Sequence, residues 1–269
     1  MKIAIYGKGG IGKSTISSNI SVCMAKNGRK VLQIGCDPKH DSTLLLLNDN
    51  LNPILNVITE KLNYSMADLF ATGKYGVDCI EIGGPAPGVG CAGRGIIKGL
   101  EVINEFNLLE NNYDLITYDV LGDVVCGGFF EPVKKGGVQE IYIITSGEFN
   151  SLFAANNICK GYLNCKLQDK KIKLSGIIGN YRNIPNESNV VRDFCQKTNL
   201  RLIAEISRDN DIERNTSKGL PFVEQCPESE SAKQINIICN YIQDKNKRMQ
   251  IPTPLELHEL REIVLKYAN

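Results

Sequence analysis

The chain has 269 residues, with 31 Lys and Arg against 30 Asp and Glu, and hydrophobic residues make up 42% of it. This composition is typical of a globular α/β protein and argues against disorder. A net charge of +1 gives no general attraction for nucleic acid, and the longest aliphatic run, 44–47, is too short to span a membrane. The opening MKIAIYGKGG lacks the hydrophobic region of a signal peptide, so we expect a cytoplasmic protein.

Short apolar runs rich in β-formers alternate with helical stretches, which predicts an α/β fold with a mostly parallel twisted sheet flanked by helices. No linker divides the chain, so we expect one domain over residues 1–269, in which 251–269 form a C-terminal tail. The predicted strands are 3–6, 31–35, 79–82, 115–119, 141–145, 174–178 and 202–206, and the predicted helices are 14–27, 96–105, 152–162, 188–198 and 231–243.

The first predicted strand leads directly into a phosphate-binding loop. Glycines let backbone N–H groups converge on phosphate oxygens, and the N-terminus of the following helix adds a favourable potential. Lys13 is expected to reach the β- and γ-phosphates, and the Ser14 hydroxyl to ligate Mg²⁺. The segment fits G-x-x-x-x-G-K-S/T and, with the adjoining threonine, predicts a P-loop NTPase fold; its residues are Gly7, Lys8, Gly9, Gly10, Ile11, Gly12, Lys13, Ser14 and Thr15.

Lys8 is an additional lysine inside this loop. It is typical of the deviant subclass of P-loop ATPases, in which this lysine crosses a dimer interface to contact the nucleotide of the other subunit. The alternative is a solvated loop lysine.

Carboxylates follow two of the predicted strands, where magnesium requires them. Asp119 at the end of strand 115–119 is the natural Walker-B-like acid, because an acid at the tip of an apolar strand is costly unless a cation or hydrogen bonds satisfy it. Asp37 and Asp41 could act on the metal or on the attacking water, although Asp41 could instead cap a helix. Asp123 follows closely after Asp119, and His40 receives no role.

Two of the ten cysteines stand apart, and no pair in the chain forms C-x-x-C, which argues against a zinc ribbon or a thioredoxin-like pair. Cys91 and Cys126 lie in the glycine-rich stretches 83–95 and 120–137, each of which follows a predicted strand. Glycine beside a thiolate lets backbone N–H groups reach the sulfur, as in iron–sulfur sites. Two thiolates cannot hold a four-iron cluster, but a twofold dimer would supply four.

Three of the other cysteines lie in hydrophobic stretches. We interpret Cys23, Cys159 and Cys239 as small buried apolar residues, because free cysteine is among the most buried residue types. Disulfides are disfavoured in the cytoplasm.

The tail begins at a break, Ile251-Pro-Thr-Pro. It has one apolar side, but its other side carries too few basic residues for a membrane-surface helix. We therefore expect it to pack against its own domain or against a twin subunit.

Four segments taken in order, GKGGIGKST, GCDPKHDST, GGPAPGVGCAGRG and YDVLGDVVCGGF, resemble the nitrogenase iron protein family. That family includes the ATP-binding iron–sulfur reductases of dark protochlorophyllide reduction and of nickel-tetrapyrrole cyclisation. The similarity extends over the whole chain, through EIYIITSGE, FAANNICKG and the closing IPTPLELHELREIV.

The resemblance implies a homodimer in which Cys91 and Cys126 of both chains hold one 4Fe-4S cluster, while each subunit binds MgATP. Hydrolysis would gate low-potential electron delivery to a separate catalytic complex, and a ferredoxin or flavodoxin would supply the electrons. By motif match, Asp37 and Asp41 belong to a first nucleotide-sensing switch and Asp123 to a second, which leads to Cys126. The resemblance thus assigns catalytic roles to Lys8, Asp37 and Asp123.

Three further residues are assigned by the same resemblance. Arg94 matches an arginine used in partner docking, which some family members ADP-ribosylate; the alternative is a solvated surface arginine. Asn180 matches an asparagine that contacts adenine. Asp209 resembles a second base-side contact, although Ser207 stands where the family usually has proline.

The sequence leaves the catalytic partner open. Nitrogenase members typically have Ala at the position of His40 and Glu at that of Ala86, and Met-rich residues where 149–152 stand. QIGCDPKHDST is closer to the tetrapyrrole-reducing branches, whereas GVGCAGRG and the tail are closer to nitrogenase. A more distant alternative is a cluster-free positioning ATPase of the deviant-Walker class, which would not need the two glycine-flanked cysteines.

Overall fold

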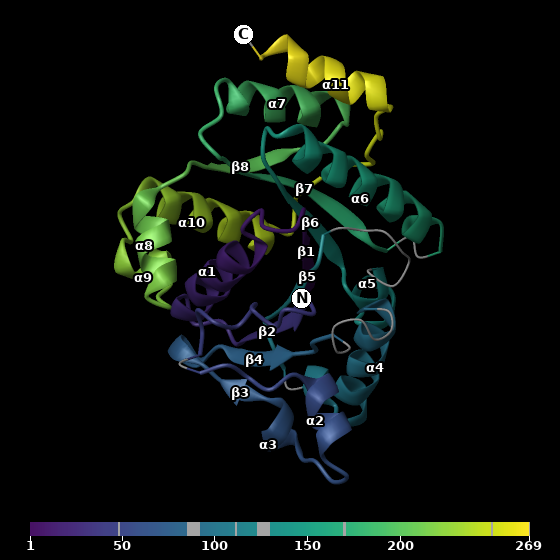
Figure 1. The fold of residues 1–269 in the computed structure, drawn as a ribbon, viewed down its shortest axis with the longest axis vertical. Coiled ribbons are helices and arrows are strands. Elements are labelled where there is room, and N and C mark those ends of the chain that lie inside the picture. The colour runs from purple at the N-terminus through teal and green to yellow at the C-terminus, as the bar shows by residue number, and fades with distance from the viewer. Residues whose placement is uncertain are drawn as a thin grey trace.

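The computed structural model describes residues 1–47, 49–84, 92–110, 112–122, 130–168, 171–248 and 250–268. These residues form one eight-stranded sheet in the order β3-β4-β2-β5-β1-β6-β7-β8 (Figure 1). All neighbouring strands are parallel except β3 and β4. The strands are β1 (Lys2–Tyr6), β2 (Val31–Cys36), β3 (Ala71–Thr72), β4 (Asp78–Glu81), β5 (Leu115–Val120), β6 (Glu140–Thr145), β7 (Lys173–Asn180) and β8 (Leu202–Ile206).

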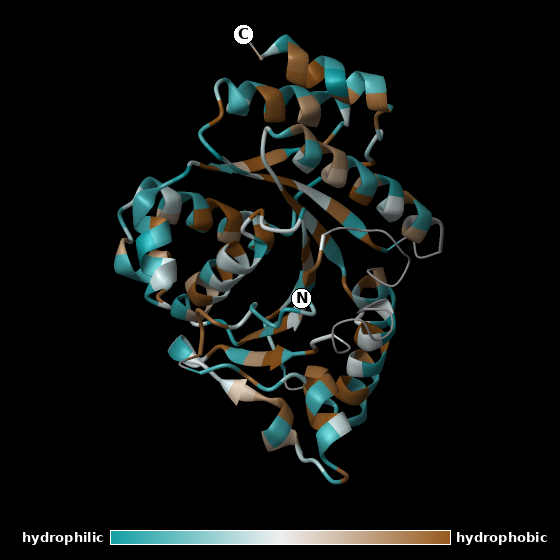
Figure 2. Ribbon diagram, in the orientation of Figure 1, coloured by the Kyte–Doolittle hydropathy of each residue, from teal (hydrophilic) through white to brown (hydrophobic). Residues whose placement is uncertain are grey.

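Helices cover both faces of this sheet, and a separate apolar core lies under each cover (Figures 1 and 2). Along β1, for example, Ile3 and Ile5 join one core while Ala4 and Tyr6 join the other. One face carries α1 (Lys13–Lys26), α8 (Asn210–Ser217), α9 (Phe222–Gln225) and α10 (Glu230–Gln243). The other carries α2 (Ile54–Glu60), α3 (Met66–Leu69), α4 (Ala92–Glu105), α5 (Glu131–Lys135), α6 (Phe149–Gln168), α7 (Glu187–Lys197) and α11 (Leu257–Lys266).

The predicted α/β fold is confirmed, and all seven predicted strands are present within a residue or two of their expected bounds. The predicted burial of Cys23, Cys159 and Cys239 is also confirmed, since each is at most 4% exposed. β3 was not predicted, because a two-residue strand leaves no periodic pattern in the sequence.

The glycine-rich stretches contain more helix than the sequence predicts. Helix α5 occupies part of 120–137, where Pro132 stands in its first turn, a position that proline favours. Helix α4 begins at Ala92, although we expected its start at residue 96 because glycine is a poor helix former. Within α4, a Cβ on Gly99 would lie 2.4 Å from Cγ2 of Ile82, so glycine allows the helix to pack closely on the end of β4.

The tail folds back on its own chain. Helix α11 packs against α6 and α7, and Leu260 and Ile263 are buried in the core of that face. None of the described helices combines the length and the apolar character needed to cross a bilayer.

Candidate nucleotide and metal site

The loop after β1 adopts the conformation that its glycines permit. Gly10 (φ 73°) and Gly12 (φ 95°) both have left-handed backbone, which is costly for residues with a Cβ. Gly12 is the N-cap of α1, and the first turn of that helix carries no acidic residue. The N–H groups of this helix end are therefore available to an anion, as a phosphate site requires.

Lys13 lies in the floor of the loop. Its side chain is buried, and its Nζ donates a hydrogen bond to the carbonyl oxygen of Lys8 at 3.3 Å. Ser14 follows at the start of α1 and is half-buried. The loop thus carries a buried lysine at the position where the motif places the phosphate-binding lysine.

Asp119 lies near the end of β5 between β1 and β2, paired in register with Ile5 and Gly35. The residue is 1% exposed, and neither carboxyl oxygen accepts a well-formed hydrogen bond from the described residues. Burial raises the pKa of Asp119, while the charge of Lys13 acts in the opposite direction. The hydroxyls of Ser14 and Ser42 also lie close enough to Asp119 to lower its pKa. A buried carboxyl with no well-formed hydrogen bond fits a cation bound directly or through water.

The loop after β2 brings two more predicted acids to the same edge. Asp37 is buried and its Oδ1 accepts a hydrogen bond from the backbone N–H of Lys39 at 3.0 Å. Asp41 Oδ1 is buried without a hydrogen-bond partner among the described residues. Residues 42–46 form turns rather than a helix, so Asp41 does not cap one. His40 has positive φ (43°), and its Nδ1 lies 2.8 Å from the carbonyl oxygen of Pro38.

Glu81, which ends β4, is a residue that our sequence analysis did not select. It is 1% exposed; its Oε1 accepts hydrogen bonds from both N–H and Oγ1–H of Thr43 at 2.8 Å, and its Oε2 has no partner among the described residues. Burial raises the pKa of Glu81 to about 8, and the charges of Asp119 and Asp41 add to that effect. The same signal that identified Asp119, an acid at the tip of an apolar strand, could have identified Glu81.

Among the described residues, no group of three or more His, Cys, Asp and Glu side chains could hold a metal ion by itself. This agrees with the way proteins bind Mg²⁺, which commonly keeps several waters and takes one or two carboxylates together with substrate phosphates. The binding of magnesium by Ser14 and Asp119 stays a prediction.

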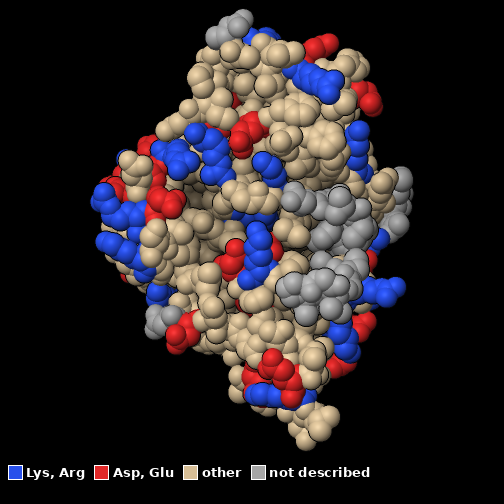
Figure 3. Space-filling model, viewed as in Figure 1, with Lys and Arg blue, Asp and Glu red and all other residues tan. Residues whose placement is uncertain are grey.

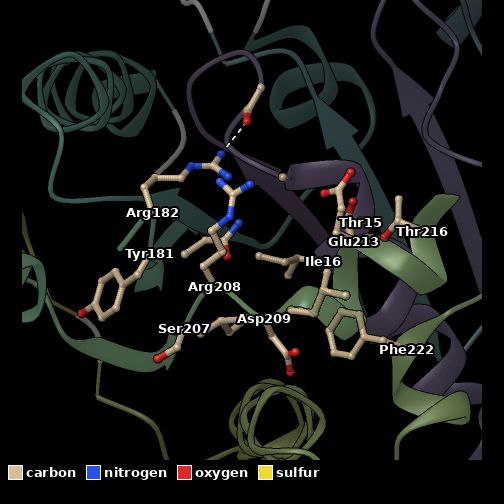
Figure 4. Close-up of a pocket in the computed structure, with 15 residues that line it drawn as sticks. Thr15, Ile16, Tyr181, Arg182, Ser207, Arg208, Asp209, Glu213, Thr216 and Phe222 are labelled. Carbon is tan, nitrogen blue, oxygen red and sulfur yellow. Dashed lines mark hydrogen bonds between the residues drawn. The ribbon is translucent and has the colours of Figure 1, made fainter. Parts of the chain in front are cut away.

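A cavity of about 250 Å³ opens beside the loop, lined by Gly10, Gly12 and Thr15 on one side (Figure 4). Asn180 at the end of β7 lines it, and its Nδ2 donates to the carbonyl oxygen of Ile11 at 2.6 Å. Asp209 also lines it and is the N-cap of α8, where its Oδ1 accepts from the N–H of Asp211 at 2.8 Å. The structure therefore brings both predicted base-side residues to one cavity, and gives Asp209 a structural role as well.

Two arginines of this cavity were not predicted to contact nucleotide. Arg182 donates from Nη2 to the carbonyl oxygen of Gly10 at 2.5 Å, and in Figure 4 both Arg182 and Arg208 extend toward the P-loop. On the surface, Lys and Arg side chains lie around a central hollow, with acidic side chains among them (Figure 3). Such a rim favours an anionic ligand.

Cys91, Cys126 and Asp123 lie outside the described residues, and so does Ala86. The described residues that lead to them, Gly84 and Gly122, follow β4 and β5, the two strands that flank β2 in the parallel part of the sheet. Both segments therefore leave the sheet at its carboxyl edge, and β5 is the direct neighbour of β1, which leads into the P-loop.

Gly122 itself touches the P-loop. A Cβ at this position would lie 1.3 Å from the carbonyl oxygen of Gly7. Only glycine fits this approach, so the chain that leads to Asp123 and Cys126 is in direct backbone contact with the nucleotide loop.

The remaining predicted residues are placed as follows. Lys8 and Gly9 are half-buried, Thr15 lines the cavity, and Arg94 is exposed in the first turn of α4. The eight described cysteines are free thiols, seven of them buried and Cys226 partly exposed.

Over residues 1–269 the chain matches the family described as 4Fe-4S iron sulfur cluster binding proteins, NifH/frxC family. It is 43% identical to the nitrogenase iron protein of Methanospirillum hungatei, covering 99% of this chain and 95% of that protein. It is 41% identical to nitrogenase iron protein 2 of Methanothermobacter thermautotrophicus, covering 99% and 98%.

The septum site-determining protein MinD of Pyrococcus horikoshii, solved with Mg-ADP, superposes with a TM-score of 0.66 at 21% identity and covers 90% of this chain and 96% of its own. This likeness supports the P-loop ATPase fold alone, whereas the sequence relatives carry the family.

Proposed function

Because the chain belongs to the NifH/frxC family of 4Fe-4S iron sulfur cluster binding proteins, we propose that it is an ATP-dependent electron-transfer protein. It acts as a homodimer that couples MgATP hydrolysis to low-potential electron delivery. The recipient is a separate catalytic complex, nitrogenase or nitrogenase-like. The observation that supports this most directly is the junction of Gly122 and Gly7, where the chain leading to Cys126 meets the nucleotide loop.

The phosphate end of the site holds MgATP through backbone N–H groups and a few side chains. The glycine loop and the start of α1 bind the β- and γ-phosphates together with Lys13. Ser14 and Asp119 hold the magnesium ion, which neutralises charge on the phosphates. The buried oxygens of Asp119, which accept no well-formed hydrogen bond from the described residues, fit this role, because a cation would lower the cost of burying them.

Four residues serve hydrolysis. Asp37 and Asp41 lie beside the phosphate end, where Asp37 orients the attacking water and Asp41 responds to the γ-phosphate. Lys8 extends from the loop toward the second subunit's nucleotide, and Asp123 completes the site after Gly122. Asn180 and Asp209 contact the base in the cavity beside the loop.

Cys91 and Cys126 from both subunits hold one 4Fe-4S cluster. The donor set fits, because thiolates are the ligands of such clusters and both cysteines follow strands that end at the same edge of the sheet. When bound, the cluster supplies one-electron transfer. The other eight cysteines support this assignment by their positions, since seven are buried within the fold.

ATP hydrolysis is coupled to the cluster through the chain that connects the nucleotide site to Cys126. A displacement of Asp123 on loss of the γ-phosphate moves the chain between Gly122 and Cys126, as in other nucleotide switches. Arg94, exposed at the start of α4, docks the catalytic complex and is a candidate for ADP-ribosylation. A ferredoxin or flavodoxin re-reduces the protein. The nitrogenase iron proteins among the relatives favour a nitrogenase-type partner over a tetrapyrrole reductase.

The first test is the iron and acid-labile sulfide content after anaerobic purification, in the wild type and in Cys91→Ser. We expect about four of each per dimer in the wild type, and a collapse of both in the variant. Cys226→Ser is the matched control, because Cys226 is a partly exposed free thiol outside both glycine-rich stretches. A reconstituted wild type with almost no iron would overturn the electron-transfer proposal and leave a P-loop ATPase.

A further inference from the structure

Glu81 has no part in the function proposed so far, yet it is one of the most deeply buried carboxyls of the chain. It ends β4, three residues before Gly84 and ten before Cys91 in the sequence. Its side chain reaches across the edge of the sheet to the loop that follows β2. Its two carboxyl oxygens contact different residues of that loop region, and these contacts indicate its role.

Glu81 holds the far end of that loop. Its Oε1 accepts two hydrogen bonds from Thr43, one from the backbone N–H and one from Oγ1, both at 2.8 Å. A single carboxyl oxygen thus fixes the main chain and the side chain of the same residue. Thr43 is two residues after Asp41, which is proposed to respond to the γ-phosphate.

Glu81 also fills the space at the near end of the loop. A Cβ on Gly35 would lie 1.8 Å from Glu81 Oε2, so the carboxyl group occupies the volume that any other residue at position 35 would need. Gly35 is in register with Glu81 across β2 and β4, and its carbonyl oxygen accepts a hydrogen bond from the N–H of Ile82 at 2.9 Å. The Glu81 carboxyl group is therefore hydrogen-bonded to the far end of the loop 37–43 and packs against Gly35, just before its near end.

A second contact joins the middle of the loop to the chain that leaves β4. A Cβ on Gly84 would lie 2.5 Å from Cβ of Pro38 and 2.9 Å from its Cα. The proline ring, which is rigid, therefore rests directly on the backbone of Gly84. Any movement of Asp37 and Pro38 meets the residue that begins the stretch leading to Cys91.

We propose that Glu81 is a positioning residue that clamps the loop 37–43 to the end of β4, so that nucleotide-dependent movement of the loop reaches the chain leading to Cys91. This gives a second connection between the phosphate and the cluster, separate from the one through Gly122 and Cys126. The inference rests on the proposed function for its direction, from nucleotide to cluster ligand. The clamp itself is supported by the contacts of Glu81 with Thr43 and of Gly84 with Pro38, which do not depend on that function.

The chemistry of the carboxyl group provides a conservative variant. Thr43 donates both hydrogen bonds to a single oxygen, Oε1 of Glu81. Glutamine has the same shape as glutamate, and its carbonyl oxygen can accept both hydrogen bonds from Thr43. Glu81→Gln should keep the clamp, whereas Glu81→Ala and Thr43→Val should loosen it. Glu81→Gln is therefore the matched control for Glu81→Ala, because it changes the same position and keeps the acceptor for Thr43.

The test is hydrogen–deuterium exchange of the anaerobically purified full-length dimer with MgATP and with MgADP. In the wild type we expect the two nucleotides to give different exchange both in residues 37–43 and in residues 79–84. In Glu81→Ala the difference in 37–43 should persist, while the difference in 79–84 falls by about three-fold or more. Thr43→Val should reduce the difference in 79–84 in the same direction, and Glu81→Gln should leave it unchanged.

Two results would overturn the clamp. One is a wild type in which the two nucleotides give the same exchange in 79–84. The other is a folded Glu81→Ala or Thr43→Val that retains the full difference; Thr43→Val keeps the proposal testable if the alanine variant does not fold. Iron content, measured on the same samples, separates the two proposals, because a protein without iron refutes electron transfer while exchange still reports on the clamp.

Discussion

The two ends of the nucleotide site are built in different ways. At the phosphate end, backbone and buried charge dominate: Gly10 and Gly12 have left-handed conformations, Lys13 is buried, and Asp119 has no partner among the described residues. At the base end, side chains from β7 and the start of α8 line an open cavity, with hydrogen bonds from Asn180 and Arg182 to loop carbonyls.

This difference indicates which end of the nucleotide site tolerates amino-acid substitutions. A phosphate site made of backbone N–H groups and buried charges tolerates almost no substitution, because each change leaves a buried group without its partner. A cavity lined by side chains can change its residues one at a time. Ser207, which stands where the family usually has proline, lies in the base cavity and not in the loop.

The largest expected effect is at the phosphate end. Lys13→Ala removes the buried cation beside Asp119, so the variant should bind MgATP about 100-fold more weakly or worse. Isothermal titration calorimetry of the anaerobic dimer measures this. Lys26→Ala, at the exposed end of the same helix, should bind as the wild type does. If Lys13→Ala lost less than the base-side variants below, the contrast between the two ends would be wrong.

The buried acid at the same end should make stability depend on pH. The pKa of Glu81 is raised from 4.5 to about 8, so between these values the folded protein keeps a proton that the unfolded chain releases. The stabilising contribution is complete below the unfolded pKa and is lost as pH rises through about 8. The free energy of unfolding should therefore fall by up to about 1.4 kcal/mol per pH unit in this interval.

Glu81→Gln does not titrate and should lack this slope. Scanning calorimetry of both proteins without nucleotide, from about pH 5.5 to about pH 8.5, compares their midpoints. The midpoint of the wild type should fall relative to that of the variant as pH rises. Parallel curves would mean that Glu81 is charged throughout.

Much of this site could be predicted from local sequence. The apolar strands, the P-loop and Asp119 are each recognisable within a few consecutive residues, because burial on both faces and phosphate binding impose patterns on neighbouring positions. The strands were the most useful of these features, since the end of each parallel strand places the residues that follow it at the same edge of the sheet.

Contacts between distant segments could not be predicted in this way. Arg182 reaches Gly10 across 172 positions of the chain, and Glu81 reaches Thr43 across 38, and no periodic pattern records either pairing. The four-residue helices α3 and α9 also lack a full repeat of the helical pattern. The fold decides these features after the strands have been brought together.

At the base end, Asn180→Ala should weaken ATP binding by about five- to ten-fold, the cost of one hydrogen bond. The Nδ2 of Asn180 donates to Ile11 in this structure, so the variant could act through the loop or through the base. Comparing ATP with inorganic tripolyphosphate separates these roles. A loss confined to ATP supports a base contact, and an equal loss for both ligands refutes it.

The smallest expected effect is that of Arg182→Ala. Its hydrogen bond to Gly10 is solvent-exposed, so we expect a change in ATP affinity of about three-fold or less, and one that shrinks as salt is added. Arg208→Ala tests the other arginine of the cavity, and the double variant shows whether the two act on the same phosphate charge. Additive losses would place them on separate parts of the nucleotide, whereas a double variant no worse than the single ones would join them in one anion contact. A loss of ATP affinity as large as that of Lys13→Ala would instead assign Arg182 to the phosphate end of the site. The end of β7 would then contribute to phosphate binding as well as to base binding.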